Sequence, residues 1–121
     1  MTERQHIVVT IIGELANVRF VDKRITDSAN IEDLGEELFS LVTQDRMKHI
    51  LLNFLGVEFM SSAALNKLIT LDKKVKEVGG ILRLCCLKDE IMEVFVLTRL
   101  NRVFDIRKTE AEALRAFGAE S

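Results

Sequence analysis

The sequence predicts an α/β fold in which four helices pack against a mixed, largely parallel sheet. Strand-like and helix-like segments alternate along the chain, and from residue 7 onward the expected order is β-β-α-β-α-β-α-β-α. Parallel strands joined through helices require right-handed crossovers, which place the helices on the faces of the sheet. We expect residues 1–121 to form a single domain, because this length suffices for one compact core and no linker-like segment divides it.

The first two strands are predicted to form an antiparallel hairpin. Every residue of Ile7–Ile12 is β-branched, and Gly13 follows directly. We expect a turn over Glu14–Asn17 and a second strand over Val18–Val21, which begins with alternating apolar and charged residues.

The middle of the chain predicts two helices around a buried strand. Apolar residues recur at intervals of three and four in Ile31–Thr43, and Asn30 is the candidate N-cap of this helix. The segment His49–Phe54 is almost continuously apolar, as in a parallel strand covered on both faces. A loop over Gly56–Ser62 then leads into a second amphipathic helix, which the pair Gly79-Gly80 should end.

The last third of the chain continues the alternation. It predicts a strand over Ile81–Leu87, a helix that begins at Asp89 and a short edge strand over Val103–Ile106. The segment Thr109–Glu112 has the pattern of a capping box, so we expect a fourth helix there that ends at Gly118.

Composition and charge exclude several classes of function. Seventeen Lys and Arg residues against nineteen Asp and Glu give a net charge of -2, and the chain has no Trp or Tyr. A nucleic-acid-binding surface needs clustered cations and usually stacking aromatic residues, so we expect no nucleic-acid partner. No apolar run has the length of a signal peptide or membrane span, and the adjacent Cys85 and Cys86 cannot build a disulfide framework. The expected location is the cytoplasm, without membrane contact.

The residues that carry chemistry form no recognisable catalytic or metal-binding pattern. His6 and His49 lie far apart in sequence and have no zinc-ligand spacing with the cysteines. The six glycines do not recur at the spacing of a phosphate-binding loop. We therefore expect no enzyme activity, no cofactor and no metal.

Two adjacent serines at the expected start of the second helix stand out. Ser61 and Ser62 lie where a serine caps free backbone N–H groups and where the helix dipole favours negative charge. A plain N-cap explains such a pair, but a phosphate at this position would also leave the helix intact while adding about -1.5 to -2 charges to any docking surface there.

The segment His49–Leu65 resembles the central signature of STAS domains, the anti-sigma factor antagonist family. In that family an apolar strand ends in Asp, and the pattern continues as hydrophobic-x-x-Val-x-Phe-hydrophobic-Asp-Ser-Ser-Gly-Leu. The residues that match it, together with the later Gly79-Gly80-Ile81-Leu82, are Phe54, Val57, Phe59, Met60, Ser62 and Leu65. The sequence departs from the pattern at Asn53 and Ser61, which replace Asp, and at Ala63 and Ala64, which replace Ser and Gly. The resemblance implies a STAS-like fold for the whole chain.

The resemblance also implies a function. Family members bind an anti-sigma factor that is also a serine kinase of the ATPase type, and this partner phosphorylates the serine at the position of Ser62. We therefore expect a non-catalytic binding switch regulated at Ser62, with Ser61 as the less favoured acceptor. The expected contact surface is the loop and the exposed face of the second helix, formed by Met60, Ser61, Ser62, Ala63, Asn66, Lys67, Thr70 and Lys74. The departures from the pattern leave a second interpretation open, an unphosphorylated scaffold subunit in a larger signalling complex. Homo- and hetero-oligomers both remain open.

Overall fold

A five-stranded sheet forms the centre of the structure. The computed structural model describes residues 4–120, with side chains through Gly118. The strand order is β1-β2-β4-β6-β7; β1 and β2 are antiparallel and all other neighbours are parallel. These strands span Ile7–Ile12 (β1), Leu15–Phe20 (β2), His49–Asn53 (β4), Ile81–Cys85 (β6) and Asp105–Arg107 (β7). The predicted mixed, largely parallel sheet is confirmed.

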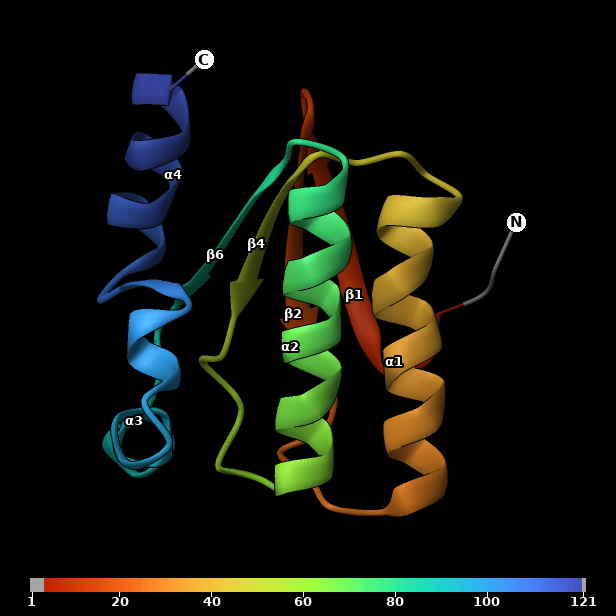
Figure 1. Ribbon diagram of the computed structural model, residues 1–121, viewed down its shortest axis with the longest axis vertical. Helices are drawn as coiled ribbons and strands as arrows, with labels where there is room; N and C mark the ends of the chain where they lie inside the picture. The colour runs from red at the N-terminus through yellow and green to blue at the C-terminus, as the bar shows by residue number, and fades with distance from the viewer. Residues whose placement is uncertain (1–3, 121) are drawn as a thin grey trace.

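Four helices pack on this sheet, as predicted. They are α1 (Ser28–Thr43), α2 (Ser62–Glu77), α3 (Asp89–Leu97) and α4 (Glu110–Glu120), and a short 3-10 helix, Leu100–Arg102, follows α3. Figure 1 shows α1 and α2 side by side across one face of the sheet. The helix α4 contacts β4, β6 and β7, and it does so from the opposite face.

Alternation along the strands explains why both faces are covered. On β4, Ile50 and Leu52 belong to the larger core beneath α1 and α2, whereas Leu51 between them packs with Ala113 and Phe117 of α4. Successive side chains of a strand point to opposite faces, so a strand covered on both sides must be apolar throughout. This is the reason for the near-continuous apolar run that the sequence shows.

Three predicted boundaries near the N-terminus and in the middle of the chain are wrong. The hairpin turns at Gly13, which has a φ of 60°, so β2 begins at Leu15 and the turn predicted over residues 14–17 is much shorter. The N-cap of α1 is Asp27, whose carboxylate accepts a hydrogen bond from the Asn30 N–H at 3.1 Å, so Asn30 lies inside the helix. Strand β6 ends at Cys85 because Cys86 has a left-handed φ of 62°.

Two further differences concern the last third of the chain and a second, smaller sheet. The strand expected at residues 103–106 is β7 at 105–107, and α4 continues through Gly118 instead of ending there. Two very short strands, β3 (Arg24–Ile25) and β5 (Phe59–Met60), pair in parallel. The strand β5 lies within the segment predicted as an irregular loop.

Candidate partner-binding site

The two serines lie at the edge of the sheet where the parallel strands end. The segment that leaves β4 and enters α2, residues 54–61, is called the β4–α2 segment below. Strands β2, β4, β6 and β7 run in the same direction, so their carboxyl ends and the first turns of all four helices meet at this edge. Loops at the carboxyl edge of an open α/β sheet are the usual place for a binding site.

The small β3–β5 sheet fixes the path of the β4–α2 segment. Strand β5 pairs with β3 so that Met60 lies opposite Ile25. The Glu58 N–H donates to the Lys23 carbonyl at 2.7 Å, and the Ser61 N–H donates to the Ile25 carbonyl at 3.0 Å. Because these hydrogen bonds satisfy backbone groups at both ends of β5, the start of α2 is held in one position.

Ser61 is the N-cap of α2. Its backbone is extended, and its Oγ accepts a hydrogen bond from the Ala64 N–H at 3.3 Å. The side chain is half-buried, and Ala64 is buried beneath the helix start. Ser61 therefore performs the structural role that its position at the helix start predicted.

Ser62 is the first residue of α2 and has a different environment. Its side chain is exposed, and within residues 4–118 its hydroxyl makes no hydrogen bond. Backbone N–H groups of the first helical turn lie beside it, where the helix dipole favours an anion. The hydroxyl is accessible to another protein, and a phosphate on it would not disturb the N-cap.

Asn53, at the position where the STAS pattern has Asp, connects the β4–α2 segment to α4. Its side chain is 2% exposed. The Asn53 amide donates to Glu110 Oε2 at 2.8 Å, and its oxygen accepts from the Leu55 N–H at 2.9 Å. Glu110 also accepts from Asn17 at 3.4 Å and lies 3.6 Å from Arg19. The hydrogen bond from Asn53 is the main reason why the pKa of Glu110 is lowered, although burial opposes it.

Glu110 was not among the predicted site residues. It is separated from Asn53 by 57 positions, and nothing in the local sequence of α4 distinguishes it from an ordinary acidic residue in the first turn of a helix. The only signal available was the substitution at Asn53, because an amide in place of a carboxylate can donate to a nearby acid.

The predicted contact residues on α2 fall into two groups. Ala63, Asn66 and Thr70 are exposed, as expected for a contact face. Lys67 and Lys74 are half-buried and engaged with α1. The Lys67 ammonium lies 3.1 Å from Glu32, and its aliphatic stem fills the space that a side chain at Gly35 would occupy.

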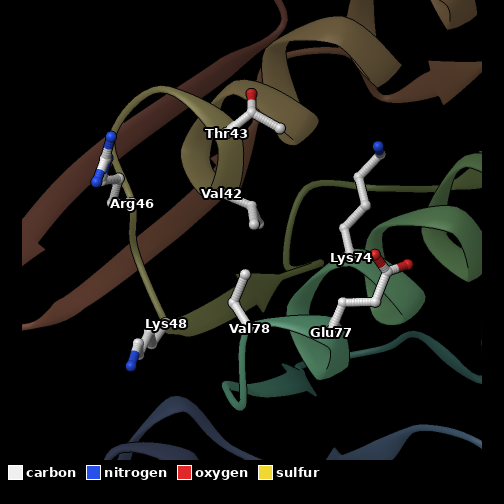
Figure 2. Close-up of a pocket in the computed structure, with 7 residues that line it drawn as sticks. All are labelled: Val42, Thr43, Arg46, Lys48, Lys74, Glu77 and Val78. Carbon is white, nitrogen blue, oxygen red and sulfur yellow. The ribbon is translucent and has the colours of Figure 1, made fainter.

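Lys74 marks the far end of the predicted surface. Its ammonium lies 5.2 Å from the centre of the Phe39 ring, and it lines a cavity of about 510 Å³ between the C-terminal ends of α1 and α2. Figure 2 shows Val42 and Val78 facing one another across this cavity. Lys74 is twelve positions after Ser62, which is about 18 Å along a helix. A partner must therefore lie along most of α2 to touch both.

Met60 requires a correction. It was predicted as a contact residue, but its side chain is 4% exposed and belongs to the main core. Its position at the end of β5 turns the side chain inward, so Met60 supports the β4–α2 segment and is not part of the exposed face of α2.

The part of the chain that the structure describes contains neither a membrane-spanning helix nor a cluster of metal ligands. No helix there has the length and apolar character needed to cross a membrane. Nor do three or more His, Cys, Asp or Glu side chains within it come together as a group that could hold a metal ion.

Comparison with known proteins agrees with this geometry. The sequence model of the STAS domain matches residues 2–113. The chain belongs to the STAS domain family. A relative from Bordetella bronchiseptica, BtrV, provisionally named an anti-sigma factor antagonist, is 30% identical over 93 residues, which is 77% of this chain and 79% of BtrV.

Solved structures of STAS proteins share the fold. A domain described as an anti-sigma factor antagonist (STAS) domain protein from Planctomyces limnophilus has a TM-score of 0.79 at 24% identity, covering 93% of this chain and 97% of its own. The Bacillus cell fate determinant SpoIIAA in its phosphorylated form has a TM-score of 0.71 at 19% identity, covering 92% of this chain and 98% of its own. The STAS-like fold inferred from the signature at residues 49–65 is confirmed.

Proposed function

We propose that this STAS domain is an anti-sigma factor antagonist, a non-catalytic protein that binds an anti-sigma factor with serine kinase activity of the ATPase type. Phosphorylation of Ser62 releases the partner. The name of the relative BtrV and the descriptions of the similar structures support this class of function. That SpoIIAA has been determined in both phosphorylated and unphosphorylated forms supports regulation by phosphate.

The proposal rests on the different environments of the two serine hydroxyls. The hydroxyl of Ser61 is used by the helix as an N-cap, whereas the neighbouring hydroxyl of Ser62 is exposed and makes no hydrogen bond within residues 4–118. A kinase can reach Ser62 without breaking the helix, and the helix N-terminus tolerates the product. Ser61 is the weaker candidate, because its modification would remove the cap.

The second candidate, an unphosphorylated scaffold subunit, rests on the departures at Ser61, Ala63 and Ala64. The carboxylate that precedes the phosphorylated serine in the STAS pattern is missing here, and a kinase that reads it would not recognise this chain. In this case the same surface would bind a partner permanently.

A capture experiment separates the two functions. Wild-type protein, Ser62→Glu and Ser62→Ala serve as baits in native lysate, and retained proteins are quantified by mass spectrometry. Ser28→Glu is the matched control, because Ser28 is the first residue of α1 and has a capping residue before it, as Ser62 has in α2. We expect wild type, Ser62→Ala and Ser28→Glu to retain an ATPase-type kinase that Ser62→Glu loses.

The retained kinase is then incubated with the purified protein and ATP. We expect the intact mass of wild type, but not of Ser62→Ala, to increase by one phosphate. Identical partners for all four baits, with no phosphate transfer, would refute the switch and support the scaffold.

A further inference from the structure

A small apolar hollow lies beside the β4–α2 segment. Its floor is made by side chains that are almost fully buried: Met60, Leu65, Ile91 and Phe95. Val94, which is half-buried on α3, forms part of its wall. Met60 directly precedes the N-cap of α2 and Leu65 lies in the first turn of this helix, so the hollow adjoins the two serines.

The size of the hollow restricts its occupant. Its volume is about 130 Å³, the share of roughly four water molecules at about 30 Å³ each. Cofactor and drug-sized ligands occupy clefts of about 300–1,000 Å³. A single apolar side chain from another protein fits this space, and a small-molecule ligand does not.

Two carboxylates stand at the rim of the hollow. Glu58 directly precedes β5, Glu90 lies in the first turn of α3, and both side chains are exposed. Within residues 4–118 neither forms an ion pair. A backbone hydrogen bond from Glu58 to Lys23 fixes the position of its Cα. The rim therefore presents negative charge that the described part of the chain leaves unneutralised.

Two large apolar side chains of the β4–α2 segment are exposed. Phe59 lines the hollow and is 43% exposed, and Leu55 in the same segment is 58% exposed. Large exposed apolar groups with a polar rim mark surfaces that bind other proteins. Covering this surface would also remove water from the two carboxylates, which is costly unless a cation pairs with them.

We propose that this hollow is the anchoring site for the anti-sigma factor partner, which inserts one apolar side chain between Glu58 and Glu90 and pairs an adjacent Arg or Lys with these carboxylates. The proposal rests on the proposed function and identifies the partner's contact chemistry. Arg fits best, since its planar guanidinium can bind two carboxylates at once. The partner's cation is then already paired with Glu58 and Glu90. A phosphate on the nearby Ser62 would be buried by the partner without a counter-charge, and this explains why phosphorylation releases the partner.

The test measures the affinity of the purified kinase retained by the wild-type bait for four variants. Glu58→Lys combined with Glu90→Lys reverses the rim, and Val94→Phe fills the hollow. The matched controls are Glu77→Lys, at the far end of α2, and Val96→Phe, the same exchange on the same helix at an exposed position that does not line the hollow. Thermal unfolding verifies that each variant is folded.

We expect both hollow variants to weaken binding at least about tenfold, which corresponds to about 1.4 kcal/mol, and both controls to stay within about twofold of wild type. If Val94→Phe does not fold, the variant Glu58→Lys combined with Glu90→Lys still tests the anchoring site, because both carboxylates are exposed. Unchanged affinity of the charge-reversed variant, while Ser62→Glu still releases the kinase, would overturn the anchoring site and leave the switch standing. A wild-type protein that binds no kinase would overturn both.

The competing occupant is a second copy of this chain. Sedimentation of the protein alone distinguishes it. We expect the monomer fraction to be the same for wild type and Val94→Phe, whereas a dimer that Val94→Phe dissociates would assign the hollow to self-association and refute the proposal.

Discussion

Replacing Asn53 by Asp restores the residue of the STAS pattern, yet we expect it to destabilise this protein. The Asn53 amide nitrogen lies 2.8 Å from Glu110 Oε2; Asn53 is almost fully buried, whereas the Glu110 side chain is 31% exposed. Asn53→Asp removes the donor and places a second carboxylate against the first. A hydrogen bond to a charged group contributes about 1.5–3 kcal/mol, and two unit charges at this separation repel by about 6 kcal/mol at an effective dielectric constant of about 20.

Protonation limits this cost. The pair can avoid repulsion by binding one proton, and at pH 7 this costs about 4 kcal/mol for a carboxyl with an ordinary pKa near 3.9, at about 1.36 kcal/mol per pH unit. We therefore expect Asn53→Asp to lose about 2–4 kcal/mol in the free energy of unfolding at pH 7, and no more than about 1.5 kcal/mol at pH 5.

The direction of this pH dependence is opposite to that of the wild-type site. In the wild type, the pKa of Glu110 is lowered by the Asn53 hydrogen bond, so the stability it contributes is present above the unfolded-state pKa and is lost as the pH falls. In Asn53→Asp the shared proton raises the pKa of the pair, so the deficit shrinks as the pH falls.

Urea unfolding at pH 5, 7 and 8 measures this prediction. Asn101→Asp is the matched control, because Asn101 is exposed and the same exchange there meets no acid hydrogen bond. The double variant Asn53→Asp with Glu110→Gln should recover most of the loss, since the glutamine amide can donate to the new carboxylate. A pH-independent deficit, or a double variant no more stable than Asn53→Asp at pH 7, would refute the assigned role of Glu110.

Four further variants test other parts of the site and fold. Ser61→Ala should cost about 1 kcal/mol in urea unfolding because the cap is lost, whereas Ser61→Asp, which retains an N-cap acceptor, should equal wild type. Gly80→Ala should lower the melting temperature, because its Cβ would overlap the carbonyl oxygen of Lys48, which cannot move freely. The pKa of Asp105 is lowered chiefly by hydrogen bonds from Arg107, so the stability that Asp105 contributes is present above its unfolded-state pKa and is lost in acid. Asp105→Asn should therefore lose less stability than wild type as the pH falls below 5, measured by acid titration of the unfolding midpoint.

Those parts of the fold that depend on local periodicity could be predicted from sequence. The β-branched run Ile7–Ile12 forms β1 over the predicted residues, and the apolar run from His49 forms the central strand β4. The helical spacing of apolar residues in α2 placed that helix correctly, and Ser61 at its start proved to be the N-cap. Each of these signals lies within a single element, so the sequence alone contains it.

The errors occur where a distant partner determines the structure. Strands β3 and β5 have two residues each and exist only because Ile25 and Met60 pair across 35 positions. Asn17, predicted to end a turn, lies in β2, and its side-chain amide donates a hydrogen bond to Glu110, which is 93 positions away. The N-cap of α1 was predicted wrongly at Asn30, because the Asp27 carboxylate accepts a hydrogen bond from the Asn30 N–H and so caps the helix three residues earlier.

The structure gives a physical reason for three of the four departures from the STAS pattern. Asn53 is matched by Glu110, which accepts its amide hydrogen bond; Ser61 retains the capping role, because its hydroxyl accepts the hydrogen bond that a carboxylate would. Ala64 buries its methyl group under the helix start, where glycine would have left the backbone less constrained. Only Ala63, which is exposed, has no structural reason. Ser61 and Ala64 thus keep the start of α2 capped and packed beside the exposed Ser62 hydroxyl, which supports the proposal that Ser62 is the regulatory residue.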